Sequence, residues 1–290
     1  MTASLLHSCR NILGEGPLWH AERKSCFWVD IEGFYLYEYT WKERTVKSRK
    51  MESYVTMIVQ GEGDQLLLGM KGGLARYHLD SGKLDWVTDI DKDIVHHRCN
   101  DGACDSRGRV WVGTMDMKFT KESGTLYCVD ENLVIKKKLD RISISNGLAW
   151  SADNTKLYYI DSPKHTVEEY HFDEATGDIR FERDAICIPE NMGTPDGMAM
   201  DEEGMLWVAH WGGFGVFRWN PFNGALLGSI DLPVPNVTSC AFAGEQLDHL
   251  IITTARENLT EKELAEYPDS GGLFIARPGV KGLPVYKCRI

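Results

Sequence analysis

Four oxygen-bearing side chains recur at comparable places in the sequence, each where a short apolar segment begins: Glu15, Asn100, Asn146 and Asp196. Asp196 lies between a proline and a glycine, and Glu15 and Asn146 are also followed directly by glycine. Carboxylate and amide oxygens are the ligands that Ca²⁺, Mg²⁺ and Mn²⁺ prefer, and Zn²⁺ and Fe²⁺ also accept them. If these side chains meet at one point, they can form an open metal site of the kind that polarises a carbonyl group.

A purely structural explanation of the same residues also stands. Asp and Asn beside glycine are common in turns, because their side chains hydrogen-bond to the local backbone. Repeated units that descend from one ancestral unit would keep such a turn at the same position. From this pattern alone, a metal site and a set of structural turns both remain open.

The chain repeats a simple unit of an apolar strand, a polar turn and a second apolar strand. In the unit around Asp196 the two strands flank a turn at 201–204. The six units begin at positions 15, 56, 100, 146, 196 and 239, which by subtraction are 41, 44, 46, 50 and 43 residues apart. A period of this length is typical of β-propeller blades.

Each unit has room for two further strands, and segments such as 35–39, 73–77 and 124–128 fit the third strand. Four strands in each of six units predict one all-β domain over residues 1–290, a six-bladed β-propeller. Only 259–267 resembles a helix. We expect the two ends, 4–10 and 285–290, to pair and close the ring, although the sequence leaves open which terminus supplies the last strand.

The propeller geometry predicts where the first residue of each unit lies. The innermost strand of every blade lines the central channel, so the residues that begin these strands face the axis at one mouth. All six carry a side-chain oxygen: Glu15, Thr56, Asn100, Asn146, Asp196 and Ser239. The sequence therefore predicts a ring of oxygen ligands around the channel.

Composition excludes several classes of partner. The net charge is −11 and no dense stripe of Lys and Arg is present, which argues against nucleic acid. No apolar run approaches the roughly 20 residues of a membrane helix, and 1–7 lacks the features of a secretion signal. These features predict a cytoplasmic protein with no membrane partner.

Other kinds of active site find little support. The eight cysteines include no C-x-x-C pair, and we expect free thiols, mostly buried, rather than disulfides or zinc ligands. The histidines show no metal-binding spacing. No G-x-S-x-G elbow is present, and the glycine-rich segments at 61–63 and 212–215 lack the rest of a phosphate loop.

Six short segments are distinctive when taken together. They read LGEGPLW at 13–19, RCND at 98–101, GTMD at 113–116, SNGLAW at 145–150, PDGM at 195–198 and TTAR at 253–256. Through these segments the chain resembles the senescence marker protein (regucalcin)/gluconolactonase family, and within it the bacterial sugar-acid lactonases. The likeness extends over essentially the whole chain.

This resemblance implies a propeller that holds one divalent metal ion (Ca²⁺, Zn²⁺, Mg²⁺, Mn²⁺ or Fe²⁺) through Glu15, Asn146 and Asp196. It also implies that Arg98 and Asn100 contact a sugar lactone and that Asp196 accepts and donates the proton. Asp116 is a candidate substrate contact, although Met117-Lys118 after it depart from the acidic residues of some family members.

The sequence thus predicts a metal-dependent hydrolase of carbohydrate metabolism that opens a sugar lactone to the aldonic acid. We expect a small-molecule substrate and a monomer or weak dimer. Two alternatives remain: a related metal-dependent esterase or phosphotriesterase, and a calcium-binding propeller without catalytic activity. Arg98 and Asn100 favour a polyhydroxylated substrate over the first alternative, and Asp196 in an open site favours turnover over the second.

Overall fold

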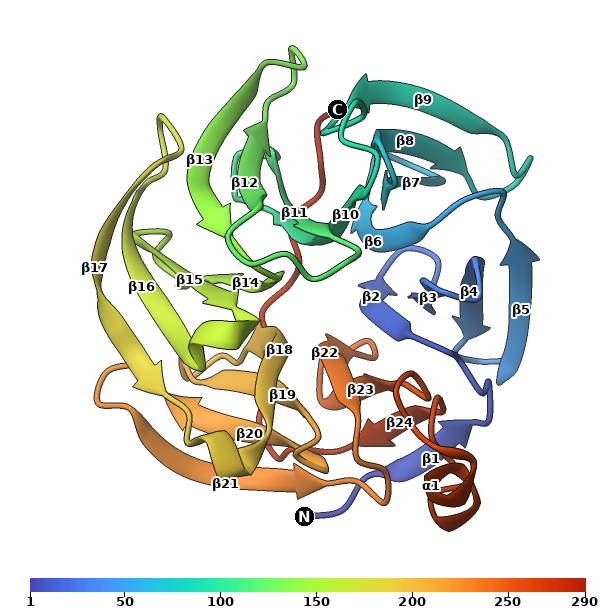
Figure 1. Ribbon diagram of the computed structural model, residues 1–290. Coiled ribbons are helices and arrows are strands. Elements are labelled where there is room, and N and C mark those ends of the chain that lie inside the picture. The colour runs from blue at the N-terminus through green and yellow to red at the C-terminus, as the bar shows by residue number, and fades with distance from the viewer.

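The protein is a ring of six four-stranded antiparallel sheets around a central opening, in a computed structural model that describes all 290 residues (Figure 1). The predicted six-bladed propeller is confirmed. The strands of each blade are given from the axis outward. Blade 1 consists of β2 (Gly14–His20), β3 (Ser25–Asp30), β4 (Tyr35–Thr40) and β5 (Thr45–Lys50), and blade 2 of β6 (Val55–Gln60), β7 (Gln65–Met70), β8 (Gly73–His78) and β9 (Leu84–Asp89). Blade 3 consists of β10 (His97–Cys104), β11 (Val110–Asp116), β12 (Gly124–Val129) and β13 (Ile135–Ile142).

The other three blades follow the same order. Blade 4 consists of β14 (Ser145–Trp150), β15 (Lys156–Asp161), β16 (Thr166–Asp173) and β17 (Asp178–Cys187), and blade 5 of β18 (Thr194–Met200), β19 (Leu206–Trp211), β20 (Gly215–Asn220) and β21 (Ala225–Asp231). Blade 6 consists of β22 (Val237–Ala243), β23 (His249–Thr254), β24 (Leu273–Ala276) and β1 (Ser4–His7). The helical segments are the short α1 (Glu261–Glu266), which lies within the predicted 259–267, and two single turns, η1 (Ser162–Lys164) and η2 (Glu190–Met192).

The N-terminus closes the ring. β1 pairs with β24, with Leu5 opposite Phe274, and becomes the outer strand of blade 6. The expected pairing of the two ends is wrong, because the C-terminal tail runs beneath the blades, where the amides of Cys288 and Arg289 donate to the carbonyl oxygens of Gln60 and Gly108. Pro284 in this tail lacks the amide that a paired strand would need.

Apolar side chains pack between neighbouring blades and not at the ring axis. Six buried clusters occur, one at each boundary between blades. Between blades 1 and 2, for example, Phe27 and Val29 share a cluster with Val55 and Leu66. Burial of this surface from water holds each blade against the next.

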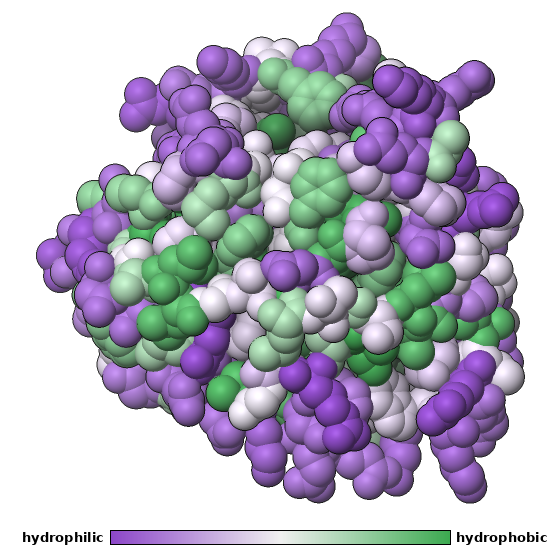
Figure 2. Space-filling model, turned by 90° about the horizontal axis from the view of Figure 1, so that it is seen from below, coloured by the Kyte–Doolittle hydropathy of each residue, from purple (hydrophilic) through white to green (hydrophobic).

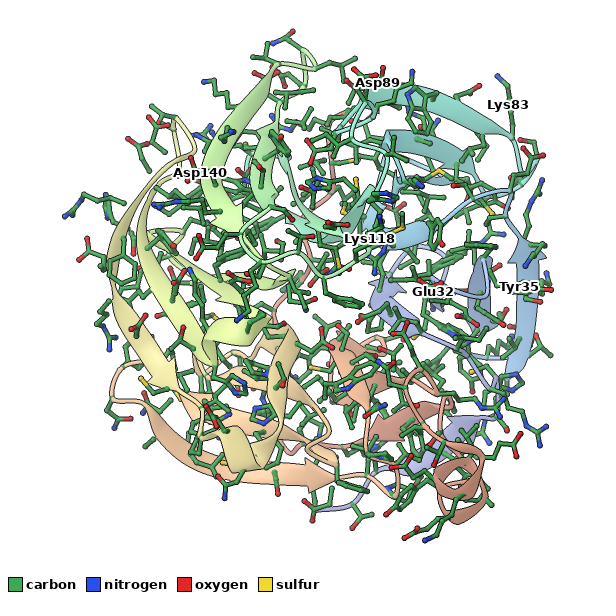
Figure 3. The ribbon with its side chains drawn as sticks, in the orientation of Figure 1. Glu32, Tyr35, Lys83, Asp89, Lys118 and Asp140 are labelled. Atoms are coloured by element: carbon green, nitrogen blue, oxygen red, sulfur yellow. The ribbon has the colours of Figure 1, made fainter.

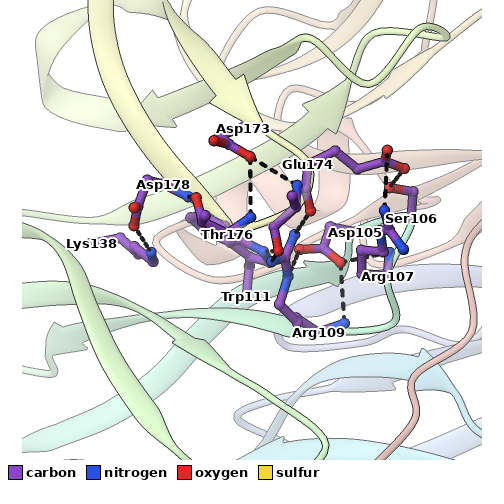
Figure 4. Close-up of polar contacts among 11 residues, drawn as sticks. Asp105, Ser106, Arg107, Arg109, Trp111, Lys138, Asp173, Glu174, Thr176 and Asp178 are labelled. Atoms are coloured by element: carbon purple, nitrogen blue, oxygen red, sulfur yellow. Dashed lines mark hydrogen bonds and ion pairs between the residues drawn. The ribbon is translucent and has the colours of Figure 1, made fainter.

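A buried aspartate fixes the hairpin between the first two strands of blades 3 and 5. Asp105 accepts the amides of Arg107 and Arg109 and the indole N–H of Trp111, at 2.9, 3.2 and 2.9 Å (Figure 4). In blade 5, Asp201 accepts the corresponding donors of Glu203, Met205 and Trp207 at 3.0, 2.9 and 2.9 Å. Both aspartates are fully buried, and each pairs with an arginine of its own blade: Asp105 with Arg109, just before β11, and Asp201 with Arg218 of β20.

An edge-on view from below shows polar side chains around the outline of this side and apolar side chains between them (Figure 2). Leu226 and Leu227 of the outer strand β21 are among the exposed apolar residues. Such single exposed residues are normal for a globular surface. No helix has the length and apolar character needed to cross a membrane.

We predict that Asp201→Ala lowers the free energy of unfolding by about 3 kcal/mol, because it leaves buried N–H donors and the Arg218 guanidinium without their acceptor. Asp153→Ala is the matched control, since Asp153 occupies the same hairpin of blade 4 but is exposed. Its cost should stay below about 1 kcal/mol. Urea unfolding of both variants measures the difference, and equal losses would contradict the structural role of Asp201.

Candidate functional site

Every inner strand carries an irregularity at or beside the position where the sequence places its first oxygen-bearing residue. A bulge leaves a residue unpaired in the ladder and redirects its side chain. In each blade the pairing of the first strand with the second changes register within one short segment of the first strand. In chain order these segments are Glu15–Leu18, Val55–Met57, Cys99–Gly102, Asn146–Leu148, Pro195–Met198 and Val237–Ser239. The six bulges therefore form a ring at one end of the channel.

One cavity of about 460 Å³ gathers most of the predicted site. Its lining includes the three expected metal ligands, Glu15, Asn146 and Asp196, and the expected substrate contacts Arg98 and Asn100. These five residues come from β2, β10, β14 and β18, which belong to blades 1, 3, 4 and 5. Thr56 and Ser239, which occupy the same phase in blades 2 and 6, do not line this cavity.

Two buried aspartates position the strands that bear Glu15 and Asn146. Asp30, at the end of β3, accepts the amide of Leu13 at 2.9 Å, two residues before Glu15. Asp161, at the end of β15, accepts the amide of Ile144 at 2.9 Å, two residues before Asn146. Each aspartate thus fixes the start of the inner strand of its own blade.

Gly147 allows the inner strands of blades 4 and 5 to approach closely. A Cβ atom added there would lie 2.9 Å from the carbonyl oxygen of Asp196, closer than side chains tolerate. The glycine that follows Asn146 is therefore needed to bring Asn146 and Asp196 to the same cavity.

A chain of hydrogen bonds orients the polar side chains. Asn100 Nδ2 donates to the carbonyl oxygen of Ser145 at 2.7 Å and to Asn146 Oδ1 at 3.2 Å, and Asn146 Nδ2 donates to Ser162 Oγ at 2.7 Å. Arg98 Nη1 donates to Asn100 Oδ1. Since the amide nitrogen of Asn146 is engaged by Ser162, its oxygen is turned toward Asn100 and the cavity.

The carboxylates of this site carry unusually high proton affinity. Desolvation inside the channel raises the pKa of Glu15 to about 8, and the negative charge of Asp101 adds to the effect. Desolvation also raises the pKa of Asp196 well above its usual range, and the next largest cause is the charge of Glu15. Arg98 is the cation that opposes both shifts.

This arrangement fits a divalent cation, although it is not a cluster of the usual titratable ligands. Nowhere in the chain do three or more His, Cys, Asp or Glu side chains form a candidate metal centre. The expected set has two carboxylates and one amide, all hard oxygen donors. Two mutually repelling, desolvated carboxylates beside an inward-facing amide oxygen form a place where positive charge is favoured.

Three acidic residues near the site were not assigned from the sequence. Glu32 and Glu257 line the cavity, and Asp101 lines a mainly apolar cavity of about 190 Å³ farther along the channel. Asp101 Oδ1 accepts the amide of Gly102 at 2.7 Å, and desolvation raises its pKa to about 6. Asp101 and Glu32 are each followed by glycine, as Glu15 is, and this was a usable signal, whereas no such signal marked Glu257.

Asp116 does not line the cavity. Its Oδ1 accepts the amide of Lys118 at 2.9 Å and so supports the turn after β11, which leaves no geometric support for a substrate contact. His97, which pairs with Asp116 across the β10–β11 ladder, is buried. It lies in β10, is 6% exposed, and its Nδ1 is 3.0 Å from Asp91 Oδ2.

Comparison with known proteins shows the family to which the chain belongs. A family model described as the SMP-30/Gluconolactonase/LRE-like region matches residues 13–256. The chain belongs to this family. The matched region includes all the residues assigned to the metal and to substrate.

The relatives align with nearly the full length of this chain. A Bacillus subtilis strain 168 protein named as a sugar lactone lactonase, YvrE, is 39% identical over 96% of this chain and 95% of its own. Regucalcin of Oryctolagus cuniculus is 33% identical, over 94% and 93%. The crystal structure of a calcium-binding protein, regucalcin, from Agrobacterium tumefaciens C58 superposes with a TM-score of 0.94 at 26% identity, over 100% and 98%.

In the metal-free protein we predict that stability falls as pH rises from about 4.5 to about 8. Over this range the folded protein keeps a proton on Glu15 that the unfolded chain releases, so raising the pH favours unfolding. Glu15→Gln should flatten the decline and the exposed Glu62→Gln should not. Thermal denaturation with a chelator across this range measures it. An identical pH profile for Glu15→Gln and wild type would contradict the prediction.

Proposed function

We propose that the protein is a lactonase that hydrolyses a sugar lactone to the aldonic acid with one divalent metal ion. The observation that carries the proposal is the single cavity in which Glu15, Asn146 and Asp196 meet Arg98 and Asn100. Membership of the gluconolactonase family and 39% identity to a protein named as a sugar lactone lactonase support it.

Glu15, Asn146 and Asp196 would hold the metal. When bound, a divalent cation supplies Lewis-acid polarisation of the lactone carbonyl and neutralises the negative charge that develops on its oxygen. Three protein ligands leave room for water and substrate beside them. The oxygen-only donor set suits Ca²⁺, Mg²⁺ and Mn²⁺ and also accepts Zn²⁺ and Fe²⁺.

Asp196 would transfer the proton. Its carboxylate accepts a proton from the attacking water and returns it to the ring oxygen as the ester bond opens. A ligated cation lowers the proton affinity of a carboxylate, and the desolvation of Asp196 opposes that effect. The backbone amide of Gly197 counteracts part of the rise in the pKa of this carboxylate.

Arg98 and Asn100 would orient the sugar. Their side chains are fixed by the hydrogen-bond chain that ends at Ser162, so little conformational entropy is lost when a ligand binds. Trp211 also lines the cavity and presents an aromatic surface to it. Holding the lactone in one orientation can supply several kcal/mol of the rate enhancement.

Calcium binding without turnover is the second candidate, since the donors are all oxygen and the Agrobacterium relative is titled a calcium-binding protein. The polar mouth with Arg98 favours a polyhydroxylated substrate over an apolar ester or phosphotriester.

We also propose a cytoplasmic location. All eight cysteines are free, as expected, and most are buried, which suits a reducing compartment.

Asp196→Asn should reduce lactonase activity by at least about 100-fold while the protein stays folded, because the amide cannot accept the proton. Acid release from glucono-, xylono-, galactono- and arabinono-lactones, followed with a pH indicator against the spontaneous rate, measures it. Ser239→Ala is the control, since Ser239 occupies the same phase in blade 6 outside the cavity. Full activity in Asp196→Asn would refute the proton-transfer role.

Glu15→Gln and Asn146→Ala should weaken metal binding about tenfold or more, measured by calorimetry on chelator-treated protein titrated with Ca²⁺, Mg²⁺, Mn²⁺, Zn²⁺ or Fe²⁺. Arg98→Lys keeps the positive charge but loses the two-pronged hydrogen bonding, so it should raise KM with little change in metal affinity. Unchanged metal affinity in both ligand variants would show that the metal binds elsewhere.

A further inference from the structure

Arg98 is a buried cation without a partner of opposite charge. The side chain is 5% exposed and forms no salt bridge, and its Nε has no hydrogen-bond partner. Nη1 donates to the carbonyl oxygen of Cys99 at 3.0 Å and to Asn100 Oδ1. A buried guanidinium is normally paired, because an unpaired charge loses its hydration without compensation. Arg98 is therefore poised for a ligand that accepts hydrogen bonds.

Three carboxylates surround this guanidinium at a distance. Burial lowers the pKa of Arg98, and the charges of Glu32, Glu257 and Glu15 oppose that effect, Glu32 most strongly. None of them lies within the 4.0 Å of an ion pair with Arg98. All four side chains line the same cavity. The space between Arg98 and the carboxylates therefore belongs to the cavity where the substrate would bind.

Glu32 and Glu257 stand on loops from neighbouring blades. Glu32 lies in the loop between β3 and β4, and Figure 3 labels it on blade 1. Glu257 lies after β23, where its amide donates to the carbonyl oxygen of Ile12 at 2.9 Å and its own carbonyl accepts from Asn236 Nδ2 at 2.9 Å. Lys50 Nζ donates to the carbonyl oxygen of Gly33 at 2.6 Å, next to Glu32. Both loops are thus tied to the frame of the propeller.

A hydroxyl group suits the gap between a guanidinium and a carboxylate, because it accepts from one and donates to the other. We propose that Glu32 and Glu257, together with Arg98, form a subsite that binds those hydroxyl groups of the lactone that are remote from its carbonyl group. The subsite rests on the proposed lactonase function and restricts it to uncharged, polyhydroxylated lactones. Neither glutamate takes part in the chemical step.

The charge of the cavity gives the subsite its selectivity. Four carboxylates line the cavity, those of Glu15, Glu32, Asp196 and Glu257, against the single guanidinium of Arg98. Lys118 is near the opening in Figure 3 but does not line the cavity. A phosphate or second carboxylate on the lactone would meet Glu32 and Glu257 as like charges, and an alkyl chain would leave Arg98 unpartnered.

The test compares Glu32→Gln, Glu257→Gln and the double variant with wild type on three lactones, in metal-loaded protein. D-Glucono-δ-lactone is neutral and polyhydroxylated, its 6-phosphate adds negative charge, and δ-valerolactone has no hydroxyl groups. Glu62→Gln on the exposed β6–β7 turn is the matched control. Thermal denaturation and metal titration verify that each variant is folded and loaded.

In wild type we expect kcat/KM to be highest for D-glucono-δ-lactone. The double variant should lose roughly tenfold or more on this substrate, since it replaces two charged hydrogen-bond acceptors. It should change by less than about twofold on δ-valerolactone and gain on the 6-phosphate. Glu62→Gln should match wild type on all three.

A second measurement does not depend on turnover. 1,5-Anhydro-D-glucitol has the ring and hydroxyl groups of the sugar but no carbonyl to attack, and calorimetry should show it binding roughly tenfold more weakly to the double variant. Unchanged substrate ratios together with unchanged affinity for this polyol would overturn the subsite. Failure of wild type to hydrolyse any lactone would instead refute the proposed function, whereas the polyol titration would still report on the subsite.

Discussion

Apolar packing between neighbouring blades is the interaction on which the rest of this structure depends. Each blade buries both of its faces against neighbours, so the six clusters exist only when the ring is complete. Completion rests on β1, which travels from the N-terminus to the outer edge of the last blade and removes the free edge of β24. Once the ring is closed, the inner strands are forced side by side, and their bulges lie around one axis.

The closed ring also bears an electrostatic cost at its centre. Glu15 and Asp196 are drawn together with Asp101 nearby, in a place where water is scarce and only Arg98 offers positive charge. No local preference of the chain would bring these groups together. Apolar packing at the blade boundaries holds these carboxylates together. Their mutual electrostatic repulsion is the reason that a cation would bind.

Aspartates illustrate how the same residue type takes different roles in this fold. Asp105 and Asp201 are fully buried and saturated with hydrogen bonds from amides, an indole and an arginine, which identifies them as structural. Asp196 is almost as buried, yet no comparable set of hydrogen bonds reaches its carboxylate, and its pKa is raised well above the usual range. A buried carboxylate with unused acceptor capacity is a candidate for chemistry, whereas a saturated one supports the fold.

The sequence by itself determined the repeat, the number of blades and the phase at which Glu15, Asn100, Asn146 and Asp196 recur, because strand alternation and turn chemistry are local properties. Through its family motifs it also indicated Arg98. Only the tertiary structure decided that β1 closes the ring, that Asp116 supports a turn outside the cavity, and that Glu32 and Glu257 line one cavity with Arg98. These facts depend on contacts between residues far apart in the chain, which no local pattern encodes, and on loops whose course is set by the blades they join.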